Sequence, residues 1–202
     1  MFFGPEHIPL ENGGLSYYPQ YIDDPDTLYQ LLRDNTPWQQ PELEVYGRRY
    51  VSPRLVAFIG DVGVSYRYSG YQHIAQPWPD FLSALRDRIA LDTGYDFNCA
   101  LLNYYRNGND RMGYHSDDEP VLGRDPCVAS LSLGCARDFM LKSKINKRPA
   151  QKINLASGSL LLMLPPTQRY WQHALPVRKG LAHGRINITF RKVLLSSQDK
   201  PQ

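Results

Sequence analysis

The segment Arg185–Arg191, which reads RINITFR, alternates without exception between polar and apolar side chains. Successive side chains of an extended strand point to opposite faces, so this period of two predicts a β-strand with one polar and one apolar face. The polar face carries an arginine at each end, with Asn187 and Thr189 between them. A guanidinium group can bind a carboxylate through two parallel hydrogen bonds. This face therefore suits either bulk water or a cavity that binds a small dianion, and the pattern alone leaves both open.

Short apolar segments separated by glycine and proline fill most of the chain after Tyr95. Segments of this kind at short intervals are typical of a β-sandwich or a jelly roll. Besides the strand described above, we expect strands over residues 97–103, 128–133, 139–141, 153–155 and 159–164. The basic segment 142–148 is expected to form a loop.

The first half of the chain combines helices with further short strands. Residues 1–22 contain several prolines and glycines and are expected to form an irregular arm. One helix is expected to begin near Asp24, with Pro25 in its first turn, and a second to run from Pro79 to just before Gly94. Short strands are expected between residues 38 and 70. The predicted fold is mainly β with flanking helices, in the α+β class.

The composition indicates a single intracellular domain. The 202 residues suffice for one domain with its own core, and a net charge of +3 allows a nucleic-acid partner without requiring one. The three cysteines are odd in number and lack C-x-x-C spacing, so we expect free thiols in a reducing compartment. No apolar run is long enough to cross a membrane, and the N-terminus does not resemble a signal peptide. We expect a monomer without membrane contact, located in the cytoplasm of a bacterium or the nucleus of a eukaryote.

His115 and Asp117 form an H-x-D pair just after a glycine-containing turn. If this segment is extended, both side chains point to the same side. His173, far downstream, is the candidate for a third ligand. Two histidines and one carboxylate on one face of a metal are typical of non-heme Fe(II) oxygenases, which keep the remaining positions open. A surface histidine beside a turn aspartate would produce the same pair, so H-x-D alone is weak evidence.

Asn103 and Tyr105 lie two residues apart at the end of the strand that leads toward the H-x-D pair. Both can therefore face the same cavity and donate hydrogen bonds there. The alternative for Tyr105 is a ring that packs one wall of the core.

Four segments together resemble the AlkB family of Fe(II)/2-oxoglutarate-dependent dioxygenases, in particular the members that repair alkylated double-stranded DNA. They read NYYRNGNDRMGYHSDDE, VASLSLGCARDFML, SGSLLLM and QHALPVRKGLAHGRINITFRKV. The resemblance covers about residues 40–193 of a single catalytic domain, residues 1–202. It implies a double-stranded β-helix (jelly roll) core over about residues 96–195, preceded by an N-terminal extension and nucleotide-recognition lid over about residues 1–95.

The resemblance also implies the cofactors Fe(II), 2-oxoglutarate and O2. The metal ligands, which form the catalytic centre, would be His115, Asp117 and His173. Arg185 would bind the carboxylate of 2-oxoglutarate far from the metal and Arg191 the carboxylate nearer to it, with further contacts from Asn103, Tyr105 and Asn187.

A damaged base must leave the duplex to reach such a centre, so the family requires a base pocket and a group that fills the gap. The expected substrate contacts are Tyr46 and Gly47 of a hairpin tip with the flanking Arg48, the lid residues Tyr66, Arg67, Tyr68 and Ser69, and the carboxylates Asp118 and Glu119. 1-Methyladenine and 3-methylcytosine are cations at neutral pH, so carboxylates at the pocket mouth would favour them over normal bases.

The expected function is direct repair of DNA by oxidative demethylation of 1-methyladenine and 3-methylcytosine, with release of formaldehyde, succinate and CO2. Duplex DNA is favoured as substrate, and single-stranded DNA or RNA remains open. One alternative is the same chemistry on RNA or protein. Another is a non-catalytic nucleic-acid-binding module with a structural metal. The complete arginine strand argues against that second alternative, because a structural metal site needs no dicarboxylate pocket.

The segment Val45-Tyr46-Gly47 generates a prediction about duplex opening, since the resemblance places it at a hairpin tip that enters the base stack. Inserting such a wedge costs a few kcal/mol of unstacking per step, which a single-stranded substrate does not require. Tyr46→Ala should therefore slow repair of a methylated duplex strongly and of a methylated single strand little. Parallel kinetics on the two substrates measure this. Equal loss on both would assign Tyr46 to the fold or the base pocket instead.

Overall fold

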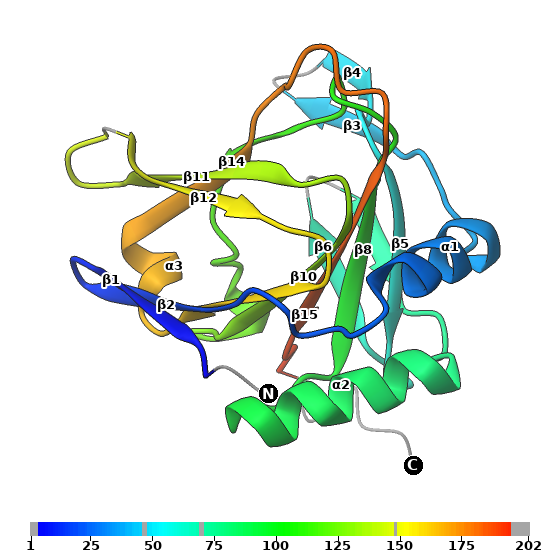
Figure 1. Cartoon of the computed structure of the whole chain (residues 1–202), viewed down its shortest axis with the longest axis horizontal. Helices are drawn as coiled ribbons and strands as arrows, with labels where there is room; N and C mark the ends of the chain where they lie inside the picture. The colour runs from blue at the N-terminus through cyan, green and yellow to red at the C-terminus, as the bar shows by residue number, and fades with distance from the viewer. Residues whose placement is uncertain (1–3, 46–47, 69–70, 148, 195–202) are drawn as a thin grey trace.

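The computed structural model describes residues 4–45, 48–68, 71–147 and 149–194. It contains two larger antiparallel sheets that face each other, with two helices packed on the outside of one of them (Figure 1). This confirms the predicted class, mainly β with flanking helices. Within the described residues, no helix has the length and apolar character needed to cross a membrane.

The larger sheet has seven strands. They are β1 (Glu6–Leu10), β2 (Gly13–Tyr18), β5 (Leu55–Gly60), β8 (Cys99–Tyr105), β10 (Val128–Gly134), β13 (Ser159–Leu164) and β15 (Arg185–Arg191). Their order across the sheet is β1-β2-β13-β10-β15-β8-β5. The facing sheet consists of β9 (Met112–His115), β11 (Arg137–Ser143), β12 (Pro149–Leu155) and β14 (Trp171–Leu175), in the order β12-β11-β14-β9.

Two further hairpins, three α-helices and one short 3-10 turn (Pro120–Leu122) complete the described elements. The hairpins pair β3 (Glu42–Val45) with β4 (Arg48–Val51), and β6 (Ser65–Tyr68) with β7 (Tyr71–Ile74). The helices are α1 (Pro25–Asn35), α2 (Asp80–Thr93) and α3 (Thr167–Tyr170). The first begins where the sequence predicted, and the second both begins and ends there. The Asp24 side chain accepts a hydrogen bond from the Thr27 N–H at the start of α1, and Gly94 ends α2 with φ at +76°.

Strand β15 lies near the middle of the larger sheet, between β10 and β8, and all seven of its side chains are buried. Its apolar side chains, Ile186, Ile188 and Phe190, are completely buried in the core between the sheet and the helices. The polar side chains alternate with them and point to the opposite side, toward the smaller sheet. The alternative of a polar face in water is thereby excluded.

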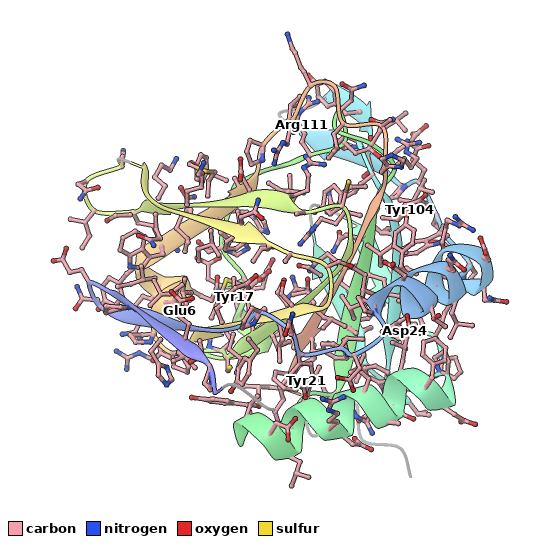
Figure 2. The ribbon with its side chains drawn as sticks, in the orientation of Figure 1. Glu6, Tyr17, Tyr21, Asp24, Tyr104 and Arg111 are labelled. Carbon is pink, nitrogen blue, oxygen red and sulfur yellow. The ribbon has the colours of Figure 1, made fainter. Side chains whose placement is uncertain are left out.

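Two apolar clusters hold these layers together. The larger joins the helices to the outer face of the sheet and contains Leu32 of α1 and Leu82 of α2. Tyr21 belongs to the same cluster and connects it to the end of α2 (Figure 2). Its hydroxyl donates a hydrogen bond of 2.7 Å to the Asp92 carboxylate. The second cluster lies between the two sheets and includes Phe139 and Leu161. It fills one part of the space between the sheets, and the remaining part is the polar pocket described below.

The prediction that residues 1–22 form an irregular arm is wrong for residues 6–18. Strands β1 and β2 form a hairpin that extends the larger sheet, because β2 pairs with β13 and buries Leu15 and Tyr17 between the sheets. The proline that argued against a strand, Pro9, lies in the outermost strand, where a missing N–H is tolerated. Gly13 is required for close approach, since a Cβ there would lie 2.7 Å from the Thr167 hydroxyl oxygen.

The structure also lengthens two predicted strands. The third expected strand, residues 139–141, extends in both directions to become β11, so Lys142 and Ser143 belong to a strand and not to the predicted basic loop. The fourth, residues 153–155, begins four residues earlier as β12. The added residues are mostly polar or alternate between polar and apolar. A search for apolar runs therefore misses them.

The burial of Ile188 yields a stability prediction. Ile188→Ala should lower the free energy of unfolding by about 2–5 kcal/mol, because a cavity would remain between the sheet and the helices. Leu91→Ala is the matched control, since Leu91 is 85% exposed and its truncation should change stability by less than about 0.5 kcal/mol. Urea unfolding followed by circular dichroism measures both. Similar values for the two variants would contradict this description of the core.

Candidate metal centre and adjoining polar pocket

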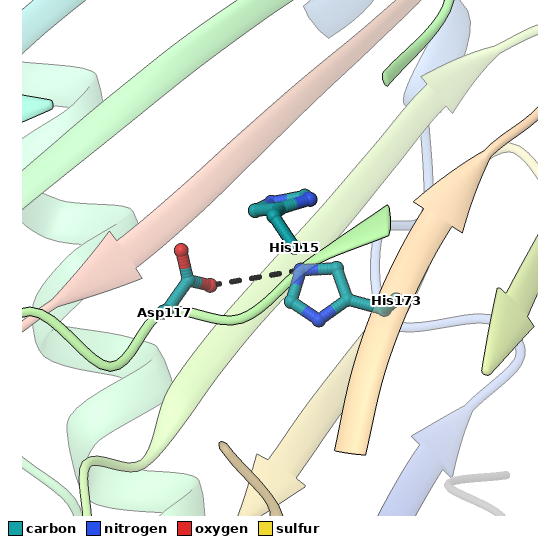
Figure 3. A group of neighbouring side chains, drawn as sticks. All are labelled: His115, Asp117 and His173. Carbon is teal, nitrogen blue, oxygen red and sulfur yellow. Dashed lines mark ion pairs between the residues drawn. The ribbon is translucent and has the colours of Figure 1, made fainter. Parts of the chain in front are cut away.

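Three side chains from separate positions in the sequence meet between the sheets: His115, Asp117 and His173 (Figure 3). His115 ends β9 and lies directly opposite His173 of β14 in the strand pairing. One ligand atom from each of the three residues lies within 4.8 Å of the others. Asp117 lies two residues beyond the end of β9, so a loop and not a strand places its carboxylate. The predicted trio is therefore brought together, although by a different local geometry from the expected extended one.

Asp117 is completely buried, and its two carboxylate oxygens have different surroundings. Oδ1 accepts a hydrogen bond of 2.7 Å from an Arg191 Nη2–H. Oδ2 lies 3.8 Å from His173 Nε2 and has no hydrogen-bond donor among the described residues. An ionised oxygen without a donor is costly to bury, whereas a metal ion would compensate it. One carboxylate oxygen and two imidazoles form a donor set that fits a divalent cation.

Both histidine rings are held in place. Nδ1 of His115 lies 3.0 Å from the Gly113 carbonyl oxygen, so a proton on Nδ1 can donate to this carbonyl and leave Nε2 as the ligand atom. The His173 ring stacks on Phe139 with the ring centres 5.2 Å apart. The two imidazoles are themselves neighbours, with centres 4.2 Å apart.

The electrostatic environment keeps these three groups in the protonation states that bind metals. Burial raises the pKa of Asp117, but the Arg191 guanidinium and the two imidazoles outweigh this and lower the pKa to about 2. Burial, followed by the proximity of His115, lowers the pKa of His173 to about 3. Burial also lowers the pKa of His115. At neutral pH the site therefore offers an ionised carboxylate and two neutral imidazoles.

The polar face of β15 forms one wall of a pocket that includes the three ligands. The pocket contains all five residues that the sequence assigned to a cosubstrate: Asn103, Tyr105, Arg185, Asn187 and Arg191. The strand pairing explains why they meet, because Tyr105 of β8 lies opposite Arg185 of β15, and Asn103 lies opposite Asn187. Side chains opposite each other on neighbouring strands share a face.

Arg185 is well placed to bind an anion. The residue is 3% exposed, and one Nη2–H donates to the Ser132 hydroxyl over 2.9 Å. Its Nε–H has no acceptor among the described residues. Burial lowers the pKa of Arg185 to about 10, so the group remains a cation at neutral pH. A buried cation with an unused donor is stabilised by an anionic ligand.

Asn187 has a different environment, because its carboxamide is engaged within the sheet. Its Nδ2 donates to the Ser130 hydroxyl over 2.8 Å and to the Leu131 carbonyl over 3.0 Å. Its Oδ1 accepts from the Thr189 hydroxyl over 2.8 Å. These contacts tie β15 to β10 beneath the pocket.

Sequence reasoning missed two arginines at this site. Arg54 lines the pocket, is 5% exposed, and donates from Nε to the Asn103 Oδ1 over 2.6 Å. Arg137 is 1% exposed, and its guanidinium lies 5.9 Å from the centre of the Tyr105 ring. It donates to three backbone carbonyls, those of Asn107, Asp110 and Pro176. Arg54 carries no signal in its own segment. Arg137 lies on the same face of β11 as the apolar Phe139 and Leu141, which a strand assignment could have used.

The predicted substrate contacts are described only in part. Tyr46, Gly47 and Ser69 lie outside the described residues, as do the side chains of Arg48, Tyr66, Arg67 and Tyr68, whose backbone forms strands β4 and β6. Asp118 accepts a hydrogen bond of 2.8 Å from the Lys144 ammonium and is largely exposed. Glu119 is half-buried and directly precedes a short 3-10 turn, Pro120–Leu122. The roles of these residues toward a substrate stay predictions.

Comparison with known proteins gives consistent results. The family model of the 2OG-Fe(II) oxygenase superfamily matches residues 14–191. The chain is 40% identical to human DNA oxidative demethylase ALKBH2 over 203 residues, which cover 95% of this chain and 78% of that protein. The Mus musculus ALKBH2 is 41% identical over 160 residues, covering 76% of this chain and 67% of the relative.

Two further similarities extend this comparison. The human alpha-ketoglutarate-dependent dioxygenase alkB homolog 3 is 36% identical over 214 residues, covering 98% of this chain and 73% of that protein. Among solved structures, that of OsALKBH1 has a TM-score of 0.63 at 16% identity and covers 93% of this chain and 100% of that chain. This last likeness concerns the fold alone.

The environment of Arg185 predicts the strength of dicarboxylate binding. Arg185→Ala should raise the dissociation constant for 2-oxoglutarate about 100-fold or more, because removing one partner of a buried ion pair costs about 3–5 kcal/mol. Arg33→Ala is the control, since the Arg33 side chain lies on α1 in an exposed ion pair with Asp34. Calorimetric titration with 2-oxoglutarate in the presence of Mn(II) gives both constants. An unchanged constant for Arg185→Ala would mean that this guanidinium does not bind the ligand.

Proposed function

The chain belongs to the AlkB family within the 2OG-Fe(II) oxygenase superfamily, and from this premise we propose that it demethylates N-alkylated bases in DNA by oxidation. The observation that carries the proposal is the polar face of β15, which is buried and joins two arginines to a His-Asp-His ligand set. A structural metal site would not require these arginines. The relatives named DNA oxidative demethylase support DNA as the substrate.

We also propose that the core is a double-stranded β-helix. From β8 to β15, successive strands alternate between the larger and the smaller sheet, except for the hairpin of β11 and β12. The larger sheet then contains the order β13-β10-β15-β8, and the smaller sheet the order β12-β11-β14-β9. Eight antiparallel strands in two sheets are typical of a jelly roll. The hairpins β3-β4 and β6-β7 would form the nucleotide-recognition lid above this core.

Membership of the family implies Fe(II), 2-oxoglutarate and O2. His115, Asp117 and His173 would hold the metal through one atom each, because the second oxygen of Asp117 is occupied by Arg191. Together the bound metal, 2-oxoglutarate and O2 supply an oxidation that converts an N-methyl group to a hydroxymethyl group, which leaves as formaldehyde, with succinate and CO2 as coproducts.

The residues of the chain would contribute binding, orientation and exclusion of water. Arg185 would pair with the carboxylate of 2-oxoglutarate far from the metal, and Tyr105 lies beside it, with the ring centre 5.5 Å from the guanidinium carbon. Arg191 would contact the carboxylate nearer the metal while it holds Asp117. Arg54 donates to Oδ1 of Asn103, and Nδ2 of Asn103 donates to the Leu101 carbonyl over 3.5 Å. The second N–H of this Nδ2 is therefore the group that would donate to the ligand.

The base to be repaired would enter from the side of the two hairpins. Tyr66 and Tyr68 would stack the base against His115, and Asp118 and Glu119 would favour the cationic lesions 1-methyladenine and 3-methylcytosine. The tip at Tyr46 would occupy the gap in a duplex, which makes duplex DNA the favoured substrate. We also propose an intracellular location, because the proposed substrate is genomic DNA. A monomer is proposed because all residues of the site belong to one chain.

Mass spectrometry of defined oligonucleotides tests the proposed function. The protein, supplied with Fe(II), 2-oxoglutarate, ascorbate and O2, should remove methyl groups from 1-methyladenine and 3-methylcytosine in single-stranded and duplex DNA. Asp117→Ala, which lacks the carboxylate ligand, should remove none. Succinate is measured in the same samples.

Each other outcome points to a different function. Demethylation of RNA alone would assign RNA as the substrate. Succinate formation without any demethylated base would keep the oxygenase chemistry and reject nucleic acid as its target. If the wild-type protein formed neither succinate nor demethylated base, a non-catalytic binding module would be the better description.

A further inference from the structure

The backbone N–H of Asp117 has a hydrogen-bond partner of its own, apart from the contacts of the carboxylate. Asp117 follows the end of β9, so its N–H does not belong to the pairing between β9 and β14. A buried N–H without an acceptor is unfavourable. Here the N–H donates to Oε1 of Gln168 over 2.9 Å. Gln168 is 1% exposed, and its Nε2 donates to the sulfur of Met163 over 3.3 Å.

We propose that Gln168 is a positioning residue that fixes the metal-binding carboxylate of Asp117 relative to His173. The proposal rests on the metal site of the proposed function but not on the DNA substrate. Gln168 belongs to α3, which leads directly into β14, the strand that carries His173. A contact from Asp117 to Gln168 therefore connects one ligand to the segment that supplies another.

A direct hydrogen bond and a bridging lysine also attach the same loop to the same segment. The Ser116 hydroxyl donates to the Trp171 carbonyl over 2.9 Å. The Lys144 ammonium donates both to the Asp118 carboxylate and to the Gln168 carbonyl, each over 2.8 Å. Residues 116, 117 and 118 are thus each linked to α3 or to the start of β14. The side chain of Gln168 provides the link at the ligand itself.

The position of Gln168 is in turn determined by its neighbour. The Thr167 hydroxyl accepts a hydrogen bond of 3.0 Å from the Gly14 N–H and donates one of 3.1 Å to the Gly14 carbonyl. Thr167 and Gln168 are both 1% exposed. One turn of helix alone would be a weak support, but this anchoring to β2 makes it a rigid one.

Metal affinity measured without any nucleic acid tests the proposal. Gln168→Met keeps the approximate length and volume of the side chain but removes the acceptor. Loss of a hydrogen bond that orients a metal ligand typically weakens metal binding about 10- to 100-fold. Calorimetric titration with Mn(II) should show a loss of this size. The visible spectrum of the Co(II)-loaded variant should also change, because the ligand geometry would shift.

Three variants complete the experiment. Tyr21→Phe removes the hydrogen bond to Asp92, far from the pocket, and should leave the Mn(II) affinity as in the wild type. Gln168→Glu keeps an acceptor oxygen whether it is ionised or protonated, so it should bind Mn(II) more tightly than Gln168→Met. Asp117→Ala should lose Mn(II) binding, which establishes that the site is the one being measured.

The outcomes are distinguishable. Wild-type Mn(II) affinity in Gln168→Met would overturn the proposal, as would an equal loss in Tyr21→Phe, which would make the effect one of general stability. If Gln168→Met does not fold, an affinity of Gln168→Glu more than 100-fold below wild type would overturn it, and one close to wild type would support it. Wild-type affinity in Asp117→Ala would instead reject the metal site, and with it the proposed function.

Discussion

The structure depends on one strand, β15, being buried on both faces. Its isoleucines and Phe190 join the helices to the larger sheet, while its arginines, Asn187 and Thr189 face the smaller sheet. Burying so many polar groups is unfavourable unless each finds a partner. The hydroxyls of Ser130 and Ser132 on β10 supply part of this compensation. The same strand thus supports the core through its even positions and organises the site through its odd ones.

The charge inside the pocket is not balanced by the protein. Three guanidinium groups line it, those of Arg54, Arg185 and Arg191, and Asp117 is the only carboxylate among the lining residues that the structure describes. A divalent metal bound to the aspartate would add to this positive charge, and a dicarboxylate would offset part of the total. Ligand binding would therefore compensate the unfavourable burial of these charged groups. Functional sites commonly lower the stability of a protein in this way. The pocket is prepared for an anionic ligand and a cation together.

Much of the site could be predicted from the sequence, because its signals are local or belong to the family resemblance. The alternation in β15 identified Arg185 and Arg191, and the H-x-D pair identified two ligands. What could not be predicted came from pairing between distant segments. The hairpin of β1 and β2 contains Pro9, Gly13 and Gly14, residues that normally interrupt a strand. These residues form strands here because β2 pairs with the edge of β13. Arg54 and Gln168 became visible only once the fold placed them beside Asn103 and Asp117.

The position of that hairpin has a consequence for solubility. Strand β13 reads SLLLML, and β2 covers the edge that it would otherwise expose. An uncovered, apolar edge strand is a template for pairing with another chain and a common start of aggregation. The outer strand β1 is a poorer template, because Pro9 cannot donate a hydrogen bond and Glu6 and His7 are exposed. Residues 6–18 therefore protect this edge, and a chain without them would lose its defence against self-association together with the anchor of Thr167.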